Sequence, residues 1–419
     1  MRDPYAGFRS AVLPNGLTVH AAYWPKRPWE AVGFLIHSGA EYDPIGLEGL
    51  SHFVEHLVSQ NANIPKELIS TFFENLGGLV NLGATGYPDT TYRFFVPADK
   101  AILAEALSMF GHMLLSVQIE KSIEQERQII INEFRLHYPA KFRFDLDLRE
   151  RKALYAGSWL ERFVRPFGAP ESIERITKND LQLHYDKHYT PANMSIVGVG
   201  GMTLPELIEL ISKSPFAVSK KGMRTPVPVP MTNVVPPLET RYVFELLKYM
   251  ATETPVEACS YRSVAKIPGN VSAHTIRVFG KMLDKLLNEE VREHRAWTYS
   301  IGSLYWDLRY FHQFSINCGS LALKALDGIE EVVEDCIASI GDCEYLFKRT
   351  KERILAKSRI TDSTGKDVCD VVLDDLANYQ RIISLKEDMN NIEQVTMDDI
   401  RNLLRWLKRE RRWTLITRP

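Results

Sequence analysis

Two histidines and a glutamate lie close together in the segment SHFVEHLVSQ, residues 51–60. At about 100° per residue, an α-helix would place His52, Glu55 and His56 on one stripe. The opposite stripe would carry the apolar residues Leu47, Leu50, Phe53, Val54 and Leu57. Two imidazoles at this spacing can hold a zinc ion, but a catalytic zinc site normally takes three protein ligands and leaves a fourth position for water. The alternative is a solvated helix face that happens to carry histidines.

A second segment, IEKSIEQERQIIINEFRLHY at residues 119–138, can supply the third ligand. It has the pattern of a helix in which Glu126 and Glu133, seven residues apart, return to nearly the same angular position. Isoleucines and a phenylalanine lie on or beside that stripe, so we expect both carboxylates to point toward the interior. A buried carboxylate without a partner is costly, and a metal ion is one of the few partners that favours two of them together. The alternative is a pair of salt bridges to buried arginines.

The order His-x-x-Glu-His, followed at a distance by Glu126 and Glu133, resembles the inverted zinc motif of the pitrilysin/insulinase family of metallopeptidases. The resemblance extends to the segments LPNGLTVH, GGLVNLGATGYPDTTY and YTPANMSIVGVGG, which match the order and spacing of that family's first domain. The length of the chain is similar to that of the short branch, which includes the mitochondrial processing peptidases and their bacterial relatives. In that branch one chain is half of a ring-like enzyme.

The resemblance implies a role for each residue of the two segments. His52, His56 and Glu133 would hold one Zn²⁺ ion, which lowers the pKa of a water molecule and polarises the scissile carbonyl. Glu55, beside the ligands but not among them, would act as general base and then as general acid. Glu126 would orient a ligand histidine and balance the charge of the cation.

The resemblance also implies residues that bind the substrate. Asn81 matches a position on a strand that pairs with the peptide backbone in the family, and a turn cap is the alternative. Arg292 and Tyr299, in VREHRAWTYSIG, match the arginine and tyrosine that relatives use to grip the substrate and the developing oxyanion. A surface arginine and a core tyrosine are the alternatives. The chain departs from the family's usual residues at 82–83 and at 296–298.

A second histidine pair competes for the metal. His184 and His188 in LHYDKHYT also stand four apart in a predicted helix. No glutamate accompanies them at the corresponding place, and the segment runs directly into Thr190 and Pro191 near the end of the helix. We therefore expect these two histidines to cap or pack rather than to bind metal.

Composition limits the class of protein. The 419 residues are 45% hydrophobic and carry a net charge of −2, which gives no electrostatic case for nucleic acid. No stretch approaches the length of a membrane span, and the first ten residues lack the apolar core of a signal peptide. The five cysteines are widely spaced, form no Cys-x-x-Cys pair and are confined to the second half, as expected of reduced thiols. These features predict a cytoplasmic protein that binds neither nucleic acid nor membrane.

A segment dense in proline divides the chain. Residues 214–240 contain Pro215, Pro226, Pro228, Pro230, Pro236 and Pro237. Proline at this density resists both helix and sheet, so the segment is predicted to be an extended linker between a zinc-binding domain at 1–213 and a second domain without zinc at 241–419. Each half mixes extended apolar runs with amphipathic helices, which indicates an α+β fold. A faint repeat, MFGHMLL at 109–115 and VFGKMLD at 278–284, agrees with what the resemblance implies, which is two similarly folded domains, each with a mostly antiparallel sheet.

The resemblance implies a zinc endopeptidase that cuts extended peptides or unfolded segments inside a chamber formed by two half-ring subunits. In four-domain relatives the residues that resemble Arg292 and Tyr299 lie in the last domain, so a second copy of this chain would have to supply them. A homodimer is therefore expected, with a heterodimer with a related chain as the alternative. A non-catalytic subunit of the same fold is the alternative function.

Overall fold

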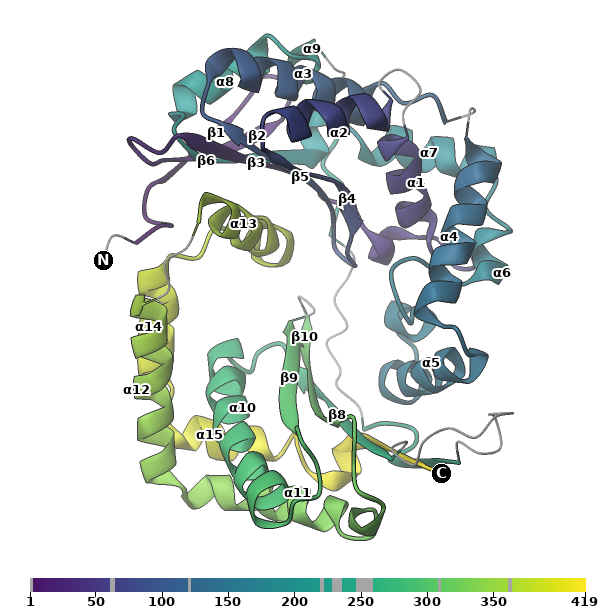
Figure 1. Cartoon of the computed structure of the whole chain (residues 1–419), viewed down its shortest axis with the longest axis vertical. Coiled ribbons are helices and arrows are strands. Elements are labelled where there is room, and N and C mark those ends of the chain that lie inside the picture. Colours follow the sequence, from purple (N-terminus) through teal and green to yellow (C-terminus); the bar gives the residue numbers. More distant parts are fainter. Residues whose placement is uncertain are drawn as a thin grey trace. The chain divides into compact units, whose positions relative to one another are not determined.

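The computed structural model describes residues 3–60, 65–119, 122–218, 222–227, 236–245, 259–307, 310–360 and 364–419. It confirms the predicted α+β class, with two separate, mostly antiparallel sheets that are each packed with helices (Figure 1). The chain divides into two compact units that exchange segments of the sequence. Unit 1 comprises Met1–Lys141, Phe163–Pro228 and Asp362–Leu385, and unit 2 comprises Phe142–Arg162, Val229–Thr361 and Lys386–Pro419.

Unit 1 is built on a six-stranded sheet in the order β1-β2-β6-β3-β5-β4. Its strands are β1 (Phe8–Val12), β2 (Thr18–Tyr23), β3 (Trp29–Ile36), β4 (Leu79–Thr85), β5 (Thr90–Pro97) and β6 (Met194–Gly200). Strands β2 and β6 are parallel, and every other pair of neighbours is antiparallel. The central strands β3 and β6 are apolar along most of their length because both of their faces are buried.

Helices cover both faces of this sheet. The main core lies on one face, under α1 (Leu50–Ser59), α2 (Lys66–Asn75), α3 (Lys100–Leu115), α4 (Ile123–His137), α6 (Pro170–Ile173), α7 (Lys178–His188), α8 (Leu204–Ser212) and α9 (Pro215–Val218). A smaller core on the opposite face is closed by α13 (Gly365–Tyr379), as Figure 1 shows. Helix α13 approaches β3 so closely that a Cβ atom at Gly33 would lie 2.6 Å from Leu373 Cδ1.

Unit 2 is built on a five-stranded sheet in the order β7-β11-β8-β10-β9. Its strands are β7 (Arg241–Glu245), β8 (Ser260–Pro268), β9 (Gly302–Asp307), β10 (Phe311–Cys318) and β11 (Arg412–Arg418). Its helices are α5 (Lys141–Tyr155), α10 (Ala273–Leu287), α11 (Ile329–Ser339), α12 (Glu344–Ile360), α14 (Leu385–Gln394) and α15 (Met397–Leu404). Helix α5 contacts the sheet through Glu150, which accepts a 2.7 Å hydrogen bond from Arg262 of β8.

The two sheets share one topology, which confirms the prediction of two similarly folded domains. In each, the last strand (β6 or β11) pairs in parallel with an early strand (β2 or β7) and antiparallel with the strand that follows that early strand in sequence (β3 or β8). The order β2-β6-β3-β5-β4 therefore corresponds to β7-β11-β8-β10-β9. The predicted repeat is nevertheless aligned wrongly, because it equates α3 with α10. Helix α10 follows β8 as α1 follows β3, so α10 is the counterpart of the helix that carries the two histidines.

The predicted linker is only partly described. Its first residues form the short helix α9, and Phe216 in that helix is fully buried against Phe34. Pro228 and Pro230 lie outside the described residues. Within the described part of the chain, none of the helices combines the length and the apolar character needed to span a bilayer.

Candidate metal centre and active site

Gly49 and Asp43 fix the N-terminal end of helix α1. Gly49 precedes it with a φ of 98°, in the left-handed region that favours glycine. The carboxylate of Asp43 then accepts hydrogen bonds from the backbone N–H groups of Gly49 at 2.8 Å and Ser51 at 2.9 Å. Because these are among the backbone donors that a helix leaves unpaired at its first turn, Asp43 holds the N-terminal end of α1 in place.

The histidine stripe of α1 is not solvated. His52 is 8% exposed and Glu55 is 7% exposed, so the helix is buried on both sides. This result excludes the alternative of a solvent-exposed histidine face. The apolar side of α1 faces the main core, and the polar side is covered by α4 and β4. The sequence of α1 alone does not predict this cover, because α4 and β4 come from other parts of the chain.

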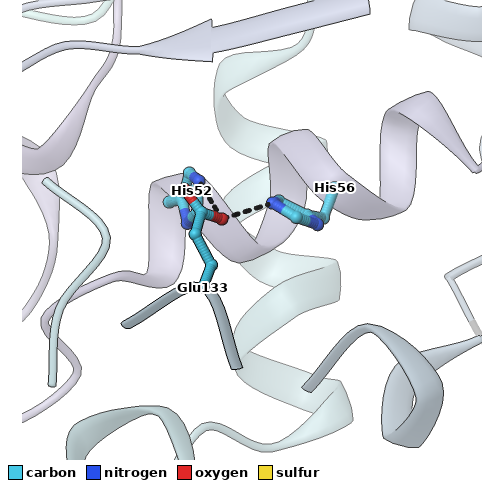
Figure 2. A group of neighbouring side chains, drawn as sticks. All are labelled: His52, His56 and Glu133. Atoms are coloured by element: carbon cyan, nitrogen blue, oxygen red, sulfur yellow. Dashed lines mark ion pairs between the residues drawn. The ribbon is translucent and has the colours of Figure 1, made fainter. Parts of the chain in front are cut away.

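Three potential ligand atoms converge between α1 and α4. Glu133 Oε2 lies 3.7 Å from His52 Nε2 and 3.5 Å from His56 Nε2 (Figure 2). Tetrahedral bonds of about 2.0–2.1 Å would place ligand atoms about 3.4 Å apart, close to both separations. Two imidazole nitrogens and a carboxylate oxygen are a donor set that suits Zn²⁺ and leaves a fourth position open. Among the described residues this is the only cluster of histidine, cysteine and acidic side chains with such geometry.

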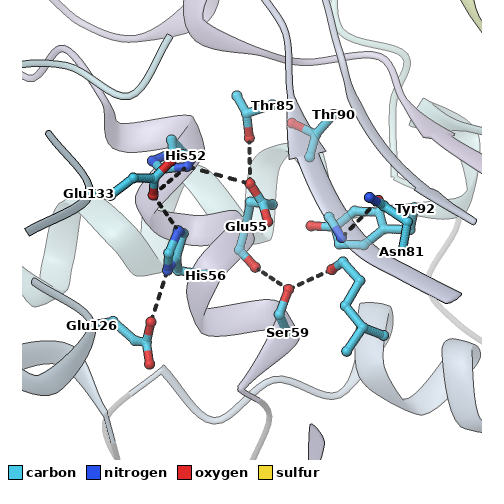
Figure 3. A network of polar contacts seen from close by, with 12 residues as sticks. His52, Glu55, His56, Ser59, Asn81, Thr85, Thr90, Tyr92, Glu126 and Glu133 are labelled. Carbon is cyan, nitrogen blue, oxygen red and sulfur yellow. Dashed lines mark hydrogen bonds and ion pairs between the residues drawn. The ribbon is translucent and has the colours of Figure 1, made fainter. Parts of the chain in front are cut away.

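Glu126 lies on the side of the His56 ring away from the three converging ligand atoms. Its Oε2 atom accepts a 2.9 Å hydrogen bond from His56 Nδ1, and the residue is 1% exposed (Figure 3). This hydrogen bond holds a proton on Nδ1, so Nε2, on the side of the ring that faces Glu133, is the nitrogen that could bind a metal ion. Among the described residues, the ion pairs of Glu126 and Glu133 are all with histidines, so the alternative of salt bridges to buried arginines is wrong.

The electrostatic environment of the cluster favours a neutral His52 and a protonated His56. Burial lowers the pKa of His52 to about 3, which keeps this imidazole neutral at pH 7. Burial also opposes the charged form of His56, but hydrogen bonds to Glu126 and Glu133 raise its pKa to about 9. With no cation between them, the carboxylates therefore stabilise a proton on His56. A metal ion bound at Nε2 would replace that positive charge.

Glu55 occupies a separate position beside the cluster. Its Oε2 atom lies 3.8 Å from His52 Nε2 and accepts a 3.2 Å hydrogen bond from Thr85 Oγ1 (Figure 3). Burial raises the pKa of the Glu55 carboxyl to about 7, against the opposing effects of His56 and Thr85. A carboxyl whose pKa lies near neutral pH is suited to accept a proton and to return it.

Two residues that support Glu55 were missed in the sequence. Thr85 donates the hydrogen bond described above, and Gly83 leaves the space that the carboxylate fills, because a Cβ atom there would lie 2.0 Å from Glu55 Oε1. A glycine inside a strand often marks a bulge or the close approach of another group, and this was the available signal. Strand β4 does contain an irregularity here, between Asn81 and Ala84.

The predicted substrate-binding residues lie in different units. Asn81, on β4 in unit 1, uses its side-chain oxygen to accept a 3.3 Å hydrogen bond from the backbone N–H of Gly83 in the same strand. Arg292 and Tyr299 are in unit 2, and the guanidinium lies 5.1 Å from the centre of the tyrosine ring. Tyr299 is 82% exposed, which excludes the alternative of a core tyrosine. Arg292 lies in a π-helical segment, Asn288–His294, that continues α10.

The second histidine pair forms a packed arrangement. His184 and His188 lie on α7, where both are buried and their ring centres are 4.4 Å apart. His184 Nε2 lies 3.2 Å from Ser51 Oγ, and His188 Nδ1 lies 2.9 Å from Thr225 Oγ1. Both rings thus have hydrogen-bond partners in the interior, in agreement with a packing role.

Comparison with known families accounts for both halves of the chain. The family described as "Insulinase (Peptidase family M16)" matches residues 19–140, and the one described as "Peptidase M16 inactive domain" matches residues 175–353. The chain belongs to peptidase family M16. This confirms the resemblance to the pitrilysin/insulinase family. The M16 inactive-domain match covers much of the second half, which contains no His-x-x-Glu-His sequence.

Curated M16 relatives match about half of the chain. The beta subunit of the mitochondrial-processing peptidase of Saccharomyces cerevisiae is 27% identical over 232 residues, which are 53% of this chain and 49% of the relative. Subunit 1 of the mitochondrial cytochrome b-c1 complex of Rattus norvegicus is 26% identical over 220 residues, or 52% of this chain and 44% of the relative. The chain therefore spans about half the length of these two curated relatives.

A solved structure matches over nearly the whole M16 chain. The structure of a protease from Helicobacter pylori has a TM-score of 0.80 and 19% sequence identity, and the match covers 98% of this chain and 99% of that one. At this identity the match establishes a shared fold.

Proposed function

We propose that this M16 chain is a zinc-dependent endopeptidase that cuts extended peptides or unfolded segments. The observation that carries the proposal is the convergence of His52 Nε2, His56 Nε2 and a Glu133 oxygen, with Glu55 beside them and outside the set. Zn²⁺ in such a site lowers the pKa of water to about 7 and polarises a peptide carbonyl. Membership of family M16 supports peptidase chemistry at this site.

The side chains around the ion have distinct tasks. Glu55 accepts the proton of the attacking water and passes it to the departing amine, with Thr85 and Gly83 fixing the position of its carboxylate. Glu126 keeps the proton of His56 on Nδ1. Arg292 and Tyr299, both exposed in unit 2, would bind the substrate and the developing oxyanion, and Asn81 would hold the peptide backbone beside β4.

The proposal includes an assembly and a location. Two half-ring subunits would enclose the substrate in a chamber, as a homodimer or as a heterodimer with a related chain, with the zinc-binding half at 1–213 and substrate residues from 241–419. The yeast relative is named as one subunit of a processing peptidase, which supports a multi-subunit enzyme. A cytoplasmic location stays a prediction, because both curated relatives are named as mitochondrial.

A non-catalytic subunit of the same fold is the second candidate function. The similarity to subunit 1 of the cytochrome b-c1 complex favours it, since that relative is named as part of a respiratory complex. The presence of His52, Glu55, His56, Glu126 and Glu133 in one cluster favours the enzyme.

Metal analysis and a cleavage assay distinguish the two candidates. Purified protein should contain one zinc ion per chain by mass spectrometry of its metals, and it should cleave an unstructured, internally quenched fluorescent peptide. Treatment with a chelator should abolish cleavage, and added Zn²⁺ should restore it. Stoichiometric zinc without cleavage of any member of a diverse peptide library, in the presence of the native partner subunits, would favour the non-catalytic subunit.

A further inference from the structure

A small recess of about 70 Å³ lies in unit 1, between the outer strands of the sheet and α13. Its walls are largely apolar and include Ala31 of β3, Leu79 of β4, Phe95 of β5 and Cys369 of α13. No role in the proposed chemistry requires this space, because the candidate metal centre lies on the opposite face of the sheet, where α1 packs.

The recess opens beside an edge of the sheet. In the described structure β4 is the last strand of the order and pairs with β5 alone, so its outer edge has no strand partner (Figure 1). Two of its backbone groups, Leu82 O and Gly83 N, form hydrogen bonds with the side chains of Ser59 and Asn81. Leu79 at this edge is 56% exposed although it is apolar. An open edge of this kind can bind an extended peptide through main-chain hydrogen bonds, while pockets for alternate side chains give specificity.

Strand β4 connects the recess to the candidate active site. At one end of the strand, Gly83 and Thr85 contact Glu55. At the other end, Leu79 pairs with Phe95 and Asn81 pairs with Arg93, and all four residues belong to the wall of the recess. A peptide that extends along β4 would therefore pass both the catalytic carboxylate and the mouth of the recess.

We propose that this recess binds one apolar side chain of the peptide, about two to four residues from the bond that faces Glu55. The spacing follows from the positions of Asn81 and Leu79 relative to Gly83. Side chains of a strand point alternately to the two faces of a sheet, so a residue of the bound peptide at the level of Leu79 to Asn81 can project over the recess. The inference rests on the proposed function for the identity of the peptide as substrate.

The charges at the mouth define what the recess should reject. Asp370 accepts a 2.5 Å hydrogen bond from Arg93 and a 3.1 Å hydrogen bond from Lys366. Two cations thus surround one carboxylate at the mouth. A leucine or methionine side chain can fill the apolar interior, whereas lysine or arginine would bring a further positive charge beside Arg93 and Lys366.

Peptide binding to the Glu55→Gln variant tests the recess without requiring turnover. The probes are fluorescent unstructured peptides in which a single leucine is moved along an otherwise alanine- and serine-rich sequence, with matched peptides that carry lysine instead. One position should favour leucine over alanine by about 10-fold in Kd, and lysine should be the least favoured there. Adding Leu79→Asp should bring the leucine-to-alanine ratio at that position close to one. The control is Leu68→Asp on α2, where the leucine is 55% exposed and far along the chain from the recess walls.

The outcomes separate the recess from the proposed function. A single leucine-selective position that Leu79→Asp removes and Leu68→Asp preserves supports the recess, whether or not the wild-type protein cleaves peptides. Equal affinity for leucine and alanine at every position, or a preference that both aspartate variants change equally, overturns it. Absence of binding by any of the peptides also overturns it. Zinc-dependent cleavage without selectivity would retain the enzyme and reject the recess.

Discussion

The Nδ1 atom of His56 lies 2.9 Å from Glu126 Oε2, while Nε2 of the same ring lies 3.5 Å from Glu133 Oε2. One imidazole thus contacts two carboxylates through opposite nitrogens, and the two contacts have different consequences. Glu126 is almost fully buried and reaches only the far side of the ring. Glu133 has a side chain that is 34% exposed and faces the open side where both Nε2 atoms converge.

This difference predicts unequal losses of zinc. Glu133→Gln removes a charged ligand and should release most of the bound metal, whereas Glu126→Gln should weaken binding about 10- to 100-fold while retaining measurable zinc. The double variant His184→Ala with His188→Ala should retain full zinc content. Titration with a fluorescent zinc chelator gives the three affinities. Equal losses of zinc in the Glu126 and Glu133 variants would mean that the ligand and the supporting residue are wrongly assigned. Loss of zinc in the double variant of His184 and His188 would indicate a second metal site.

Glu55→Gln should keep stoichiometric zinc and lose nearly all turnover. The amide fills the same space beside Thr85 but cannot accept a proton from water, so we expect kcat to fall by about 100-fold or more. The check combines metal content with kcat for a quenched fluorescent peptide. Near-normal cleavage by a zinc-loaded variant would mean that another group acts as the base.

Gly83→Ala should impair catalysis without removing the metal ligands. The new Cβ atom would lie 2.0 Å from Glu55 Oε1, so the carboxylate has to move away from its position. We expect kcat/KM to fall by about 100-fold, since small displacements of a catalytic group are costly. Gly7→Ala is the matched control, because a Cβ atom there meets no neighbour within 4 Å. Normal kcat/KM in the Gly83 variant would show that the strand yields and that this glycine does not position Glu55.

Glu30 should make the stability of the chain depend on pH. This residue of β3 is fully buried, and burial raises the pKa of its carboxyl from 4.5 to about 8. Between these values the folded chain keeps a proton that the unfolded chain releases, so the free energy of unfolding should decrease as the pH rises from 4.5 to 8 and level off above it. In Glu30→Gln this contribution should be absent. Urea unfolding of both proteins at several pH values, with the exposed Glu105→Gln as control, measures the difference. If the wild type instead became more stable relative to Glu30→Gln as the pH rises, the raised pKa of Glu30 would be contradicted.

Mixed dimers test whether two subunits share a site. Glu55→Gln and Tyr299→Phe should each be nearly inactive alone. If Tyr299 acts on the zinc centre of its partner, coexpression should recover about 25% of wild-type activity, because half of the dimers are mixed and each has one intact site. If both residues act within one chain, nothing is recovered. Mass spectrometry confirms that mixed dimers are present, and no gain in activity in that sample would exclude the shared site.

The sequence predicts those parts of the candidate site that depend on residues close together in the chain. It does not predict the parts that depend on contacts between distant segments. Helical periodicity is enough to bring His52 to His56 and Glu126 to Glu133, since each pair lies on one helix. The roles of Gly83 and Thr85 depend on contacts with Glu55, nearly thirty residues away, and on an irregular strand, which no local pattern specifies. The burial of the polar side of α1 has the same origin, because β4 and α4 cover it from distant parts of the chain.

The fold shows a similar division. Apolar runs and amphipathic helices indicate an α+β protein, and a proline-rich segment indicates two halves. They do not indicate that α5 and α13 pack with the opposite halves, because such packing depends on complementary surfaces such as Gly33 with Leu373. The faint repeat was misaligned for a related reason. Short apolar helices resemble one another in sequence, and strand order is needed to show that α10 corresponds to α1.

The dependence of unit 1 on α13 also constrains how the chain is made. The sheet face that carries Ala31, Leu35 and Val197 is covered by Val368, Val372 and neighbouring residues of α13. After Gly200 completes β6, roughly 165 further residues must be synthesised before Gly365 begins that helix, which takes about 8–30 s at about 5–20 residues per second. During this interval the nascent first half of the chain exposes an apolar surface. A chaperone that binds such surfaces on the ribosome would meet this chain in its most vulnerable state.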